Sequence, residues 1–169
     1  FMTADDACAD MDAHATATAL SELIAKVGDY DLILCGDGSA DNYAQQVDVQ
    51  LAAKLGLPVV NGATKIEAGD GFVTVERTLE DVVETVEVPL PAVVSVMPDI
   101  ALPRIPGMKD ILAAGKKPMN VAGAEGSYAN AIEVVDCKAP EQADRKLEII
   151  DASEDGAIEK FAAAIKAAL

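Results

Sequence analysis

Apolar and polar positions form their most informative pattern between residues 31 and 58. A short, wholly apolar run occupies residues 32–35, which is typical of a strand buried on both faces of a parallel sheet. Apolar residues then recur at helical spacing, at Ala44, Val47, Leu51 and Leu55. Asp41 or Asn42 supplies an N-cap for this helix, and Gly56 supplies its end. The pattern therefore predicts a strand, a loop and a helix in succession.

The loop that joins this strand to its helix contains Gly36, Asp37, Gly38 and Ser39. Glycines allow positive φ and let a ligand approach the backbone. The free N–H groups and the positive end of the helix dipole favour a phosphate at this place. The chain has neither GxGxxG nor GxxxxGK[ST], and Gly, Asp and Ser are also ordinary turn residues. An anion site and a plain turn therefore both remain open.

The same kind of pattern predicts elements on either side. We expect a helix at residues 15–27 and buried strands at 59–60 and 92–97. A helix from Gly107 or Met108 to Ala114 and a short strand at 119–121 follow. Between residues 63 and 88 the period changes to two, which predicts a small antiparallel insertion on the main sheet. These elements together predict an α/β fold with a mainly parallel sheet.

The last third of the chain has a different pattern. Residues 122–130 are small and polar and predict a linker, with short strands expected at 132–135 and 147–150. A final helix is predicted from Ser153 or Glu154. Its apolar stripe is made by Ile158, Phe161, Ile165 and Leu169. This stripe requires a surface to pack against, in this chain or in a partner.

Composition and charge restrict the classes of partner. The chain has 169 residues and a net charge of -16, from 29 acidic and 13 basic residues. Such a charge repels nucleic acid and anionic membranes, although a compact nucleotide can still bind through local N–H groups. No apolar run approaches the roughly 18 residues that a transmembrane helix needs. We therefore expect no nucleic-acid partner and no direct membrane insertion.

Candidate catalytic chemistry is sparse. Cys8, Cys35 and Cys137 are widely spaced without a CxxC motif, which favours a reduced, cytoplasmic protein. His14 is the only histidine and falls on the polar side of its predicted helix, which disfavours a histidine metal site or a Ser/His/Asp triad. We predict no metal site and no catalytic residue, and we expect the N-terminal part of an α/β domain to precede Phe1, since only one strand fits before the first helix.

Three segments, residues 35–60, 75–96 and 103–118, resemble the beta subunit of electron-transfer flavoproteins, and most closely the Fix-type branch. The resemblance runs from residue 15 to nearly the end of the chain. It implies a Rossmann-like, adenine-nucleotide-binding fold in three layers over residues 1–121, with the β insertion at about 63–88. Residues 122–169 then correspond to an arm that contacts the alpha subunit, by the likeness of residues 140–145 and the final helix. It also implies that an N-terminal part of the subunit is absent from the sequence.

The resemblance implies a nucleotide site. In this family the alpha subunit holds the electron-carrying FAD, and the beta subunit binds AMP or, in electron-bifurcating members, a second FAD. The family's phosphate contacts correspond here to Ser39, Ala40, Asn42, Gln45, Gln46 and Val47, beside Gly36 of the loop. Such amides and N–H groups suit a pyrophosphate without Lys or Arg.

The choice between AMP and FAD depends on the start of the helix. Ordinary AMP-binding members have Asn-Gln-Thr at positions 45–47, whereas Gln46-Val47 resembles the bifurcating pattern and favours FAD. That pattern usually continues with Gly, where this chain has Asp48, which we expect to face solvent because it would otherwise oppose a phosphate. Thr78 also replaces an acid that many members carry near the flavin of the alpha subunit, so the role of that acid cannot be transferred.

The segment from Arg104 through Ile105 and Met108 to Lys109 resembles the family's recognition loop, which inserts an apolar side chain into a flavin dehydrogenase. The alternative is that Met108 and Ile111 merely pack the helix start onto the sheet. The leading hypothesis is thus a non-catalytic electron-carrier subunit. A stand-alone regulatory module that binds an adenine nucleotide is the main alternative, and a small α/β enzyme is disfavoured by the lack of a nucleophile with its base.

Overall fold

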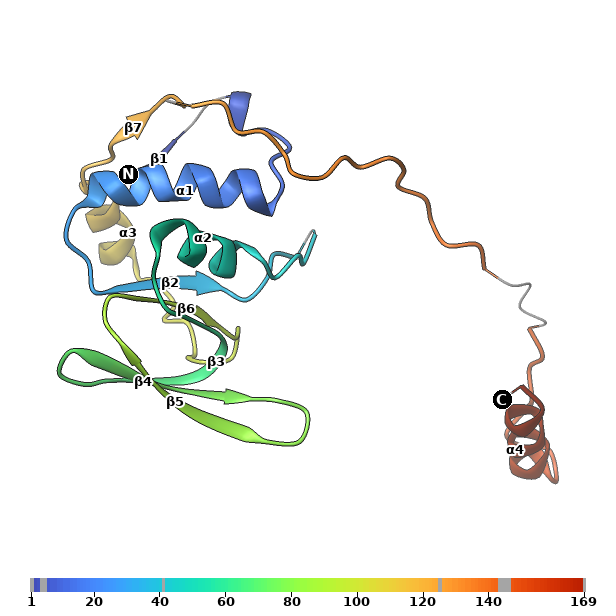
Figure 1. Ribbon diagram of the computed structural model, residues 1–169. Helices are drawn as coiled ribbons and strands as arrows, with labels where there is room; N and C mark the ends of the chain where they lie inside the picture. Colours follow the sequence, from blue (N-terminus) through green and yellow to red (C-terminus); the bar gives the residue numbers. More distant parts are fainter. Residues whose placement is uncertain (1, 4–5, 41, 125, 143–146, 169) are drawn as a thin grey trace. The chain divides into compact units, whose positions relative to one another are not determined.

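The computed structural model describes residues 2–3, 6–40, 42–124, 126–142 and 147–168 (Figure 1). The chain divides into two compact units, Phe1–Glu133 and Val134–Leu169. In the first unit, helix α2 (Val47–Leu55) lies between helix α1 (Ala13–Val27) and one face of a five-stranded sheet (Figure 1). The α/β class predicted from the sequence is confirmed.

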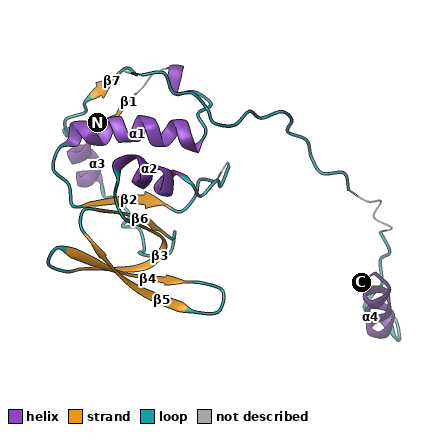
Figure 2. Cartoon of the chain, in the orientation of Figure 1, coloured by secondary structure: helices purple, strands orange, loops and turns teal. Residues whose placement is uncertain are grey.

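The sheet has the strand order β2-β6-β3-β4-β5 (Figure 2). Its strands are β2 (Leu32–Gly36), β3 (Val59–Ala68), β4 (Phe72–Thr78), β5 (Val83–Pro89) and β6 (Ala92–Val96). The pairs β2–β6 and β6–β3 are parallel, whereas β3–β4 and β4–β5 are antiparallel. The antiparallel pairing predicted within residues 63–88 is confirmed, and the described sheet is mixed, with a parallel half and an antiparallel half.

Strand β3 joins the two halves. The sequence predicted a buried strand at 59–60 and a separate antiparallel insertion from about residue 63, but β3 is continuous across this boundary. Gly62 has φ +69, and the register shifts on both sides of Ala63, so the strand bends without ending. The start of β3 therefore pairs with β6, and its end pairs with β4.

The core lies on the sheet and is built from small aliphatic side chains, valine and alanine. Its buried cluster comprises Val60, Ala63, Val73, Val75, Val88, Ala92 and Val94. Leu51 and Ala52 of α2 are also buried, as is Val93 of β6. The expectation that residues 32–35 are buried on both faces was wrong: Leu34 is 59% exposed, because β2 is an edge strand that pairs only with β6 among the described strands.

Capping residues determine where the helices of the first unit begin and end. Asp12 caps α1, since its Oδ1 accepts the N–H of Ala15 at 2.8 Å. Gly56 ends α2 in the left-handed conformation, as predicted. The predicted start of α2 was wrong, because the helix begins at Val47; Asn42 lies in the preceding turn, and Asp41 lies outside the described residues.

The remaining elements of the first unit are short. A 3-10 turn, η1 (Asp6–Cys8), precedes α1. Strand β1 (Met2–Thr3) pairs in parallel with β7 (Val121–Ala122), and helix α3 (Met108–Ala114) has no buried residue. The predicted helix at 108–114 is confirmed.

The second unit contains helix α4 (Ala157–Ala168), which confirms a final helix but starts it three residues after Glu154. The strands predicted at 132–135 and 147–150 were wrong, because these residues form no ladder within the described chain. The apolar residues Ile158 and Phe161 are 81% and 58% exposed, and Leu169 lies outside the described residues. None of the described helices is long and apolar enough to cross a membrane.

Candidate functional site

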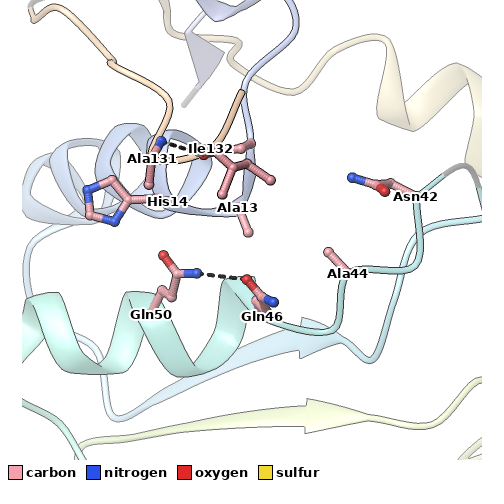
Figure 3. Close-up of a pocket in the computed structure, with 9 residues that line it drawn as sticks. Ala13, His14, Asn42, Ala44, Gln46, Gln50, Ala131 and Ile132 are labelled. Atoms are coloured by element: carbon pink, nitrogen blue, oxygen red, sulfur yellow. Dashed lines mark hydrogen bonds between the residues drawn. The ribbon is translucent and has the colours of Figure 1, made fainter. Parts of the chain in front are cut away.

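A pocket of about 490 Å³ lies between the N-terminal ends of α1 and α2 in the first unit (Figure 3). This volume falls within the range of about 300–1,000 Å³ that is usual for small-molecule sites. One wall comes from the start of α1, a second from α2 and its preceding loop, and a third from residues 131–132. Its lining residues are Asp12, Ala13, His14, Asn42, Ala44, Gln46, Gln50, Ala131 and Ile132.

A second hollow, of about 260 Å³, adjoins the pocket. It is lined by His14, Gln50, Ala53 and Lys54, so the two hollows share His14 and Gln50. The residues that line the two hollows lie along α2 from its first turn to Lys54 in its last turn. His14 is exposed, as predicted from its position on the polar side of the helix.

The loop between β2 and α2 is organised by the side chain of Asp37. Its Oδ2 accepts the hydroxyl of Tyr43 at 3.0 Å and Nε2 of Gln45 at 2.9 Å. The Tyr43 N–H also donates to the carbonyl of Ser39 at 3.0 Å. The bond to Asp37 raises the pKa of Tyr43, with a further contribution from the charge of Asp37. The loop is therefore a defined turn that brings Asn42 and Ala44 to the pocket.

Two residues of this loop have a strained backbone. Tyr43 and Gln45 have φ of +46 and +52, which costs a residue with a side chain about 1–2 kcal/mol. Gly38 lies under the ring of Tyr43, since a Cβ at Gly38 would stand 2.6 Å from Cδ2 of that ring. A helix cannot include these positive φ values, so α2 begins only at Val47.

The N-terminus of α2 has no side-chain cap. The side chain of Gln46, the N-cap residue, makes no capping bond, and its Oε1 instead accepts Nε2 of Gln50 at 3.1 Å (Figure 3). The first N–H groups of a helix lack partners within that helix and carry the positive end of its dipole. The end of α2 at the pocket therefore combines two amide side chains with backbone donors.

The wall opposite α2 is fixed by the carboxylate of Asp12. Its Oδ1 caps α1, and its Oδ2 accepts the N–H groups of Ala131 at 2.6 Å and Ile132 at 3.1 Å. The N–H donors, that of Ala15 first, hold the pKa of Asp12 below its ordinary value, against desolvation. One side chain thus joins the start of α1 to the segment that covers the pocket.

We name residues 126–132 the strap, because hydrogen bonds attach them along α1 and its N-terminal approach. Tyr128 donates its hydroxyl to Oε2 of Glu22 at 2.5 Å. Asn130 accepts the N–H of Asp12 at 2.8 Å and donates to the carbonyl of Asp10 at 2.9 Å. The strap coincides with the greater part of the linker predicted at residues 122–130, yet it is bound to the first unit.

Asp48 does not face solvent, contrary to our expectation. It is 3% exposed and lies on the same face of α2 as Leu51 and Ala52, which pack towards the sheet. Its charge adds to burial in raising the pKa of the Cys35 thiol. The carboxylate is not among the groups that line the pocket, so it does not compete there with an anion.

The seven predicted cofactor-binding residues lie in one stretch at the carboxyl end of β2, but only Asn42 and Gln46 line the pocket. Gly36 ends β2, Ala40 is exposed and Val47 is the first residue of α2. Gln45 donates to Asp37, and Ser39 closes the turn with its carbonyl. Sequence reasoning missed the residues from α1 and from the strap. Asp12 was detectable as a capping residue, whereas Ala131 and Ile132 carry no signal.

The four predicted docking residues lie together before and at the start of α3. Ile105 is 89% exposed and Met108 is 73% exposed, and Arg104 and Lys109 are also exposed. The alternative in which Met108 and Ile111 pack on the sheet was wrong, since Ile111 is 55% exposed. The helix start is fixed by Asp110, which accepts the N–H of Gly107 at 2.9 Å.

Within the described residues, no group of three or more His, Cys, Asp or Glu side chains is arranged to hold a metal ion. In a comparison with protein families, the family described as the electron transfer flavoprotein domain matches residues 2–126. The matched region contains α1, the sheet, the Asp37 loop, α2 and α3, and it ends at the first residue of the strap.

Proposed function

Because the chain belongs to the electron transfer flavoprotein family, we propose that it is a beta subunit of the Fix-type branch. The match over residues 2–126 carries this proposal, together with the resemblance of residues 35–60, 75–96 and 103–118. In this role the chain pairs with an alpha subunit and passes electrons between dehydrogenases and an acceptor. Because all three cysteines are free, we place it in the cytoplasm.

The nucleotide site of this subunit is the pocket between α1 and α2 with the adjoining Asp37 loop. The parallel strands β2, β6 and β3, with α2, form its Rossmann-like half, and ligands of such sheets bind at the carboxyl ends of the strands. Asn42, Gln46 and Gln50 supply amide groups, and α2 supplies N–H donors. Both carboxylate oxygens of Asp12 accept hydrogen bonds from backbone N–H groups, and these donors lessen the repulsion between the carboxylate and a phosphate.

These residues fit AMP or the AMP half of FAD. Asn42 and Gln46 of the pocket would approach the phosphates, together with the predicted contacts of the loop and helix start, Gly36, Ser39, Ala40, Gln45 and Val47. The apolar carbons of Ala44 and Ile132 would contact the remainder. A bound FAD would supply a redox-active flavin ring, whereas AMP would supply none. The chain itself binds and orients the nucleotide.

The docking surface of this subunit is formed by Arg104, Ile105, Met108 and Lys109. Exposed methionine suits an adaptable contact, because it is flexible and polarizable. Residues 122–169 form the arm that contacts the alpha subunit; the strap at its start is bound to α1, and the exposed stripe of α4 supplies its apolar face. Residues 1–121 hold most of the nucleotide-binding part, and Ala131 and Ile132 complete its pocket.

Co-expression with the neighbouring alpha-like subunit tests this function. We expect a yellow heterodimer whose released cofactors, separated by HPLC, are FAD with AMP or two FAD. A colourless chain that binds AMP alone would support the regulatory module instead. A heterodimer with the alpha-subunit FAD alone would leave the family assignment intact and remove the nucleotide site.

A further inference from the structure

We propose that the strap is a latch on the nucleotide pocket and that Asp12 is its positioning residue. This inference rests on the proposal that the pocket binds a nucleotide. It adds that the bound ligand holds residues 126–132 in place, and through them the point at which the second unit begins.

The first observation is that the strap supplies a wall of the pocket. Ala131 and Ile132 line it opposite Asn42 and Gln46, so a ligand between the helices contacts both the strap and the Asp37 loop. Ile132 is 66% exposed although it lines a pocket. A ligand there covers part of this apolar side chain, which favours the seated strap over a released one.

The second observation is how the strap is attached. Hydrogen bonds join the strap to Glu22, to the backbone of Asp10 and Asp12 and to the Asp12 carboxylate, and most of these bonds are at exposed positions. Hydrogen bonds contribute about 0.5–3 kcal/mol each, the bonds to carboxylates at the upper end, so local opening of the strap costs less free energy than unfolding of the core. A ligand that binds only the seated form shifts this equilibrium towards it.

The third observation is the double role of Asp12. Oδ1 fixes the first turn of α1, and Oδ2 fixes the last residues of the strap, so one side chain sets the spacing between two pocket walls. Glu133 follows directly and is the last residue of the first unit. The seated strap therefore restrains Glu133, the residue that precedes Val134–Leu169. Nucleotide binding then reduces the mobility of the chain where the second unit begins.

Asp12→Ser separates the two roles of the side chain. Serine is an N-cap as good as aspartate, so α1 is retained, but it has no second oxygen for Ala131 and Ile132. Asn130→Ala removes the neighbouring strap bonds without changing the cap. Ser21→Ala is the matched control, because Ser21 bonds to Thr18 within α1 and lies outside the pocket.

The experiment uses the full chain with AMP and FAD as probes. It measures affinity by calorimetry and amide exchange at Ala131 and Ile132 by NMR or mass spectrometry. We expect the nucleotide to slow exchange at these amides in the unmodified chain and in Ser21→Ala. Asp12→Ser and Asn130→Ala should speed exchange there and raise Kd about tenfold. The far-UV circular dichroism of the variants should not change.

Three outcomes overturn the latch. If the unmodified chain binds AMP or FAD and both strap variants bind it equally well, the strap does not respond to the ligand. If binding leaves exchange at Ala131 and Ile132 unchanged, the nucleotide site stands and the latch falls. If the chain binds neither probe, both the proposed nucleotide site and the latch are refuted.

Discussion

Oδ2 of Asp12 accepts a hydrogen bond of 2.6 Å from the N–H of Ala131, which joins positions 119 residues apart. This bond brings the segment after β7 back to the start of α1 and encloses a pocket that neither region forms alone. It also makes the first unit sensitive to the charge of one carboxylate.

Stability should depend on pH through Asp12. N–H donors lower its pKa in the folded chain below the ordinary value of 3.8. A carboxylate of this kind contributes stability above its unfolded pKa and loses it as the pH falls through the folded pKa. We predict that the urea midpoints of the unmodified chain and Asp12→Ser differ at about pH 6 and converge as the pH falls through the folded pKa of Asp12. A difference that is independent of pH would contradict this role.

The glycines of the loop should respond differently to a methyl group. Gly38→Ala places a Cβ 2.6 Å from the Tyr43 ring and should destabilise the chain by about 1–3 kcal/mol. Gly36→Ala, the matched control, meets no atom within 4 Å. The thermal midpoint of Gly36→Ala should equal that of the unmodified chain. Weaker nucleotide binding by Gly36→Ala would then come from a clash between the added methyl group and the nucleotide. Equal losses of stability in both variants would refute the packing of Tyr43 on Gly38.

The reactivity of Cys35 should reveal the buried carboxylate. Burial, and then the charge of Asp48, raise the pKa of this thiol, whereas Cys137 is exposed. Because the thiolate is the reactive form, iodoacetamide should modify Cys137 well before Cys35. Asp48→Asn should speed the modification of Cys35 and leave Cys137 unchanged, as measured by peptide mass spectrometry. An unchanged rate at Cys35 would mean that Asp48 does not act on it.

The sequence predicted the elements whose side chains repeat with a clear period. The antiparallel insertion at about 63–88, the buried run that became β6 and the helix that became α1 were assigned correctly, because local pattern and final packing agree there. Residues 132–135 and 147–150 have β-branched side chains but no ladder among the described strands, so propensity alone misled.

The candidate site was only partly predictable. The carboxyl end of β2 was located correctly, but positive φ at Tyr43 and Gln45, supported by Asp37, delayed the start of α2. No pattern in the sequence indicates this later start of the helix. In the helix that results, Asp48 faces the sheet. The bond from Asp12 to the strap spans too much chain for any local pattern.

The docking surface should tolerate substitution in the isolated chain. Met108 is 73% exposed, so Met108→Asp should change stability by less than about 0.5 kcal/mol. In the heterodimer it should abolish flavin reduction by the partner dehydrogenase without loss of cofactor. Leu112→Asp, at a 62% exposed position one turn along α3, is the control and should preserve reduction. Normal reduction of the Met108 variant would remove the docking role.

The nucleotide content of the heterodimer tests the proposed site most directly. Gln46→Ala removes an amide from the pocket wall, and Asn120→Ala removes an amide from an exposed position outside the pocket. HPLC of the released cofactors should show that Gln46→Ala loses AMP or the second FAD and keeps the FAD of the alpha subunit, while Asn120→Ala retains both. Full nucleotide content in the Gln46 variant, or none in the unmodified heterodimer, would contradict a nucleotide site between α1 and α2.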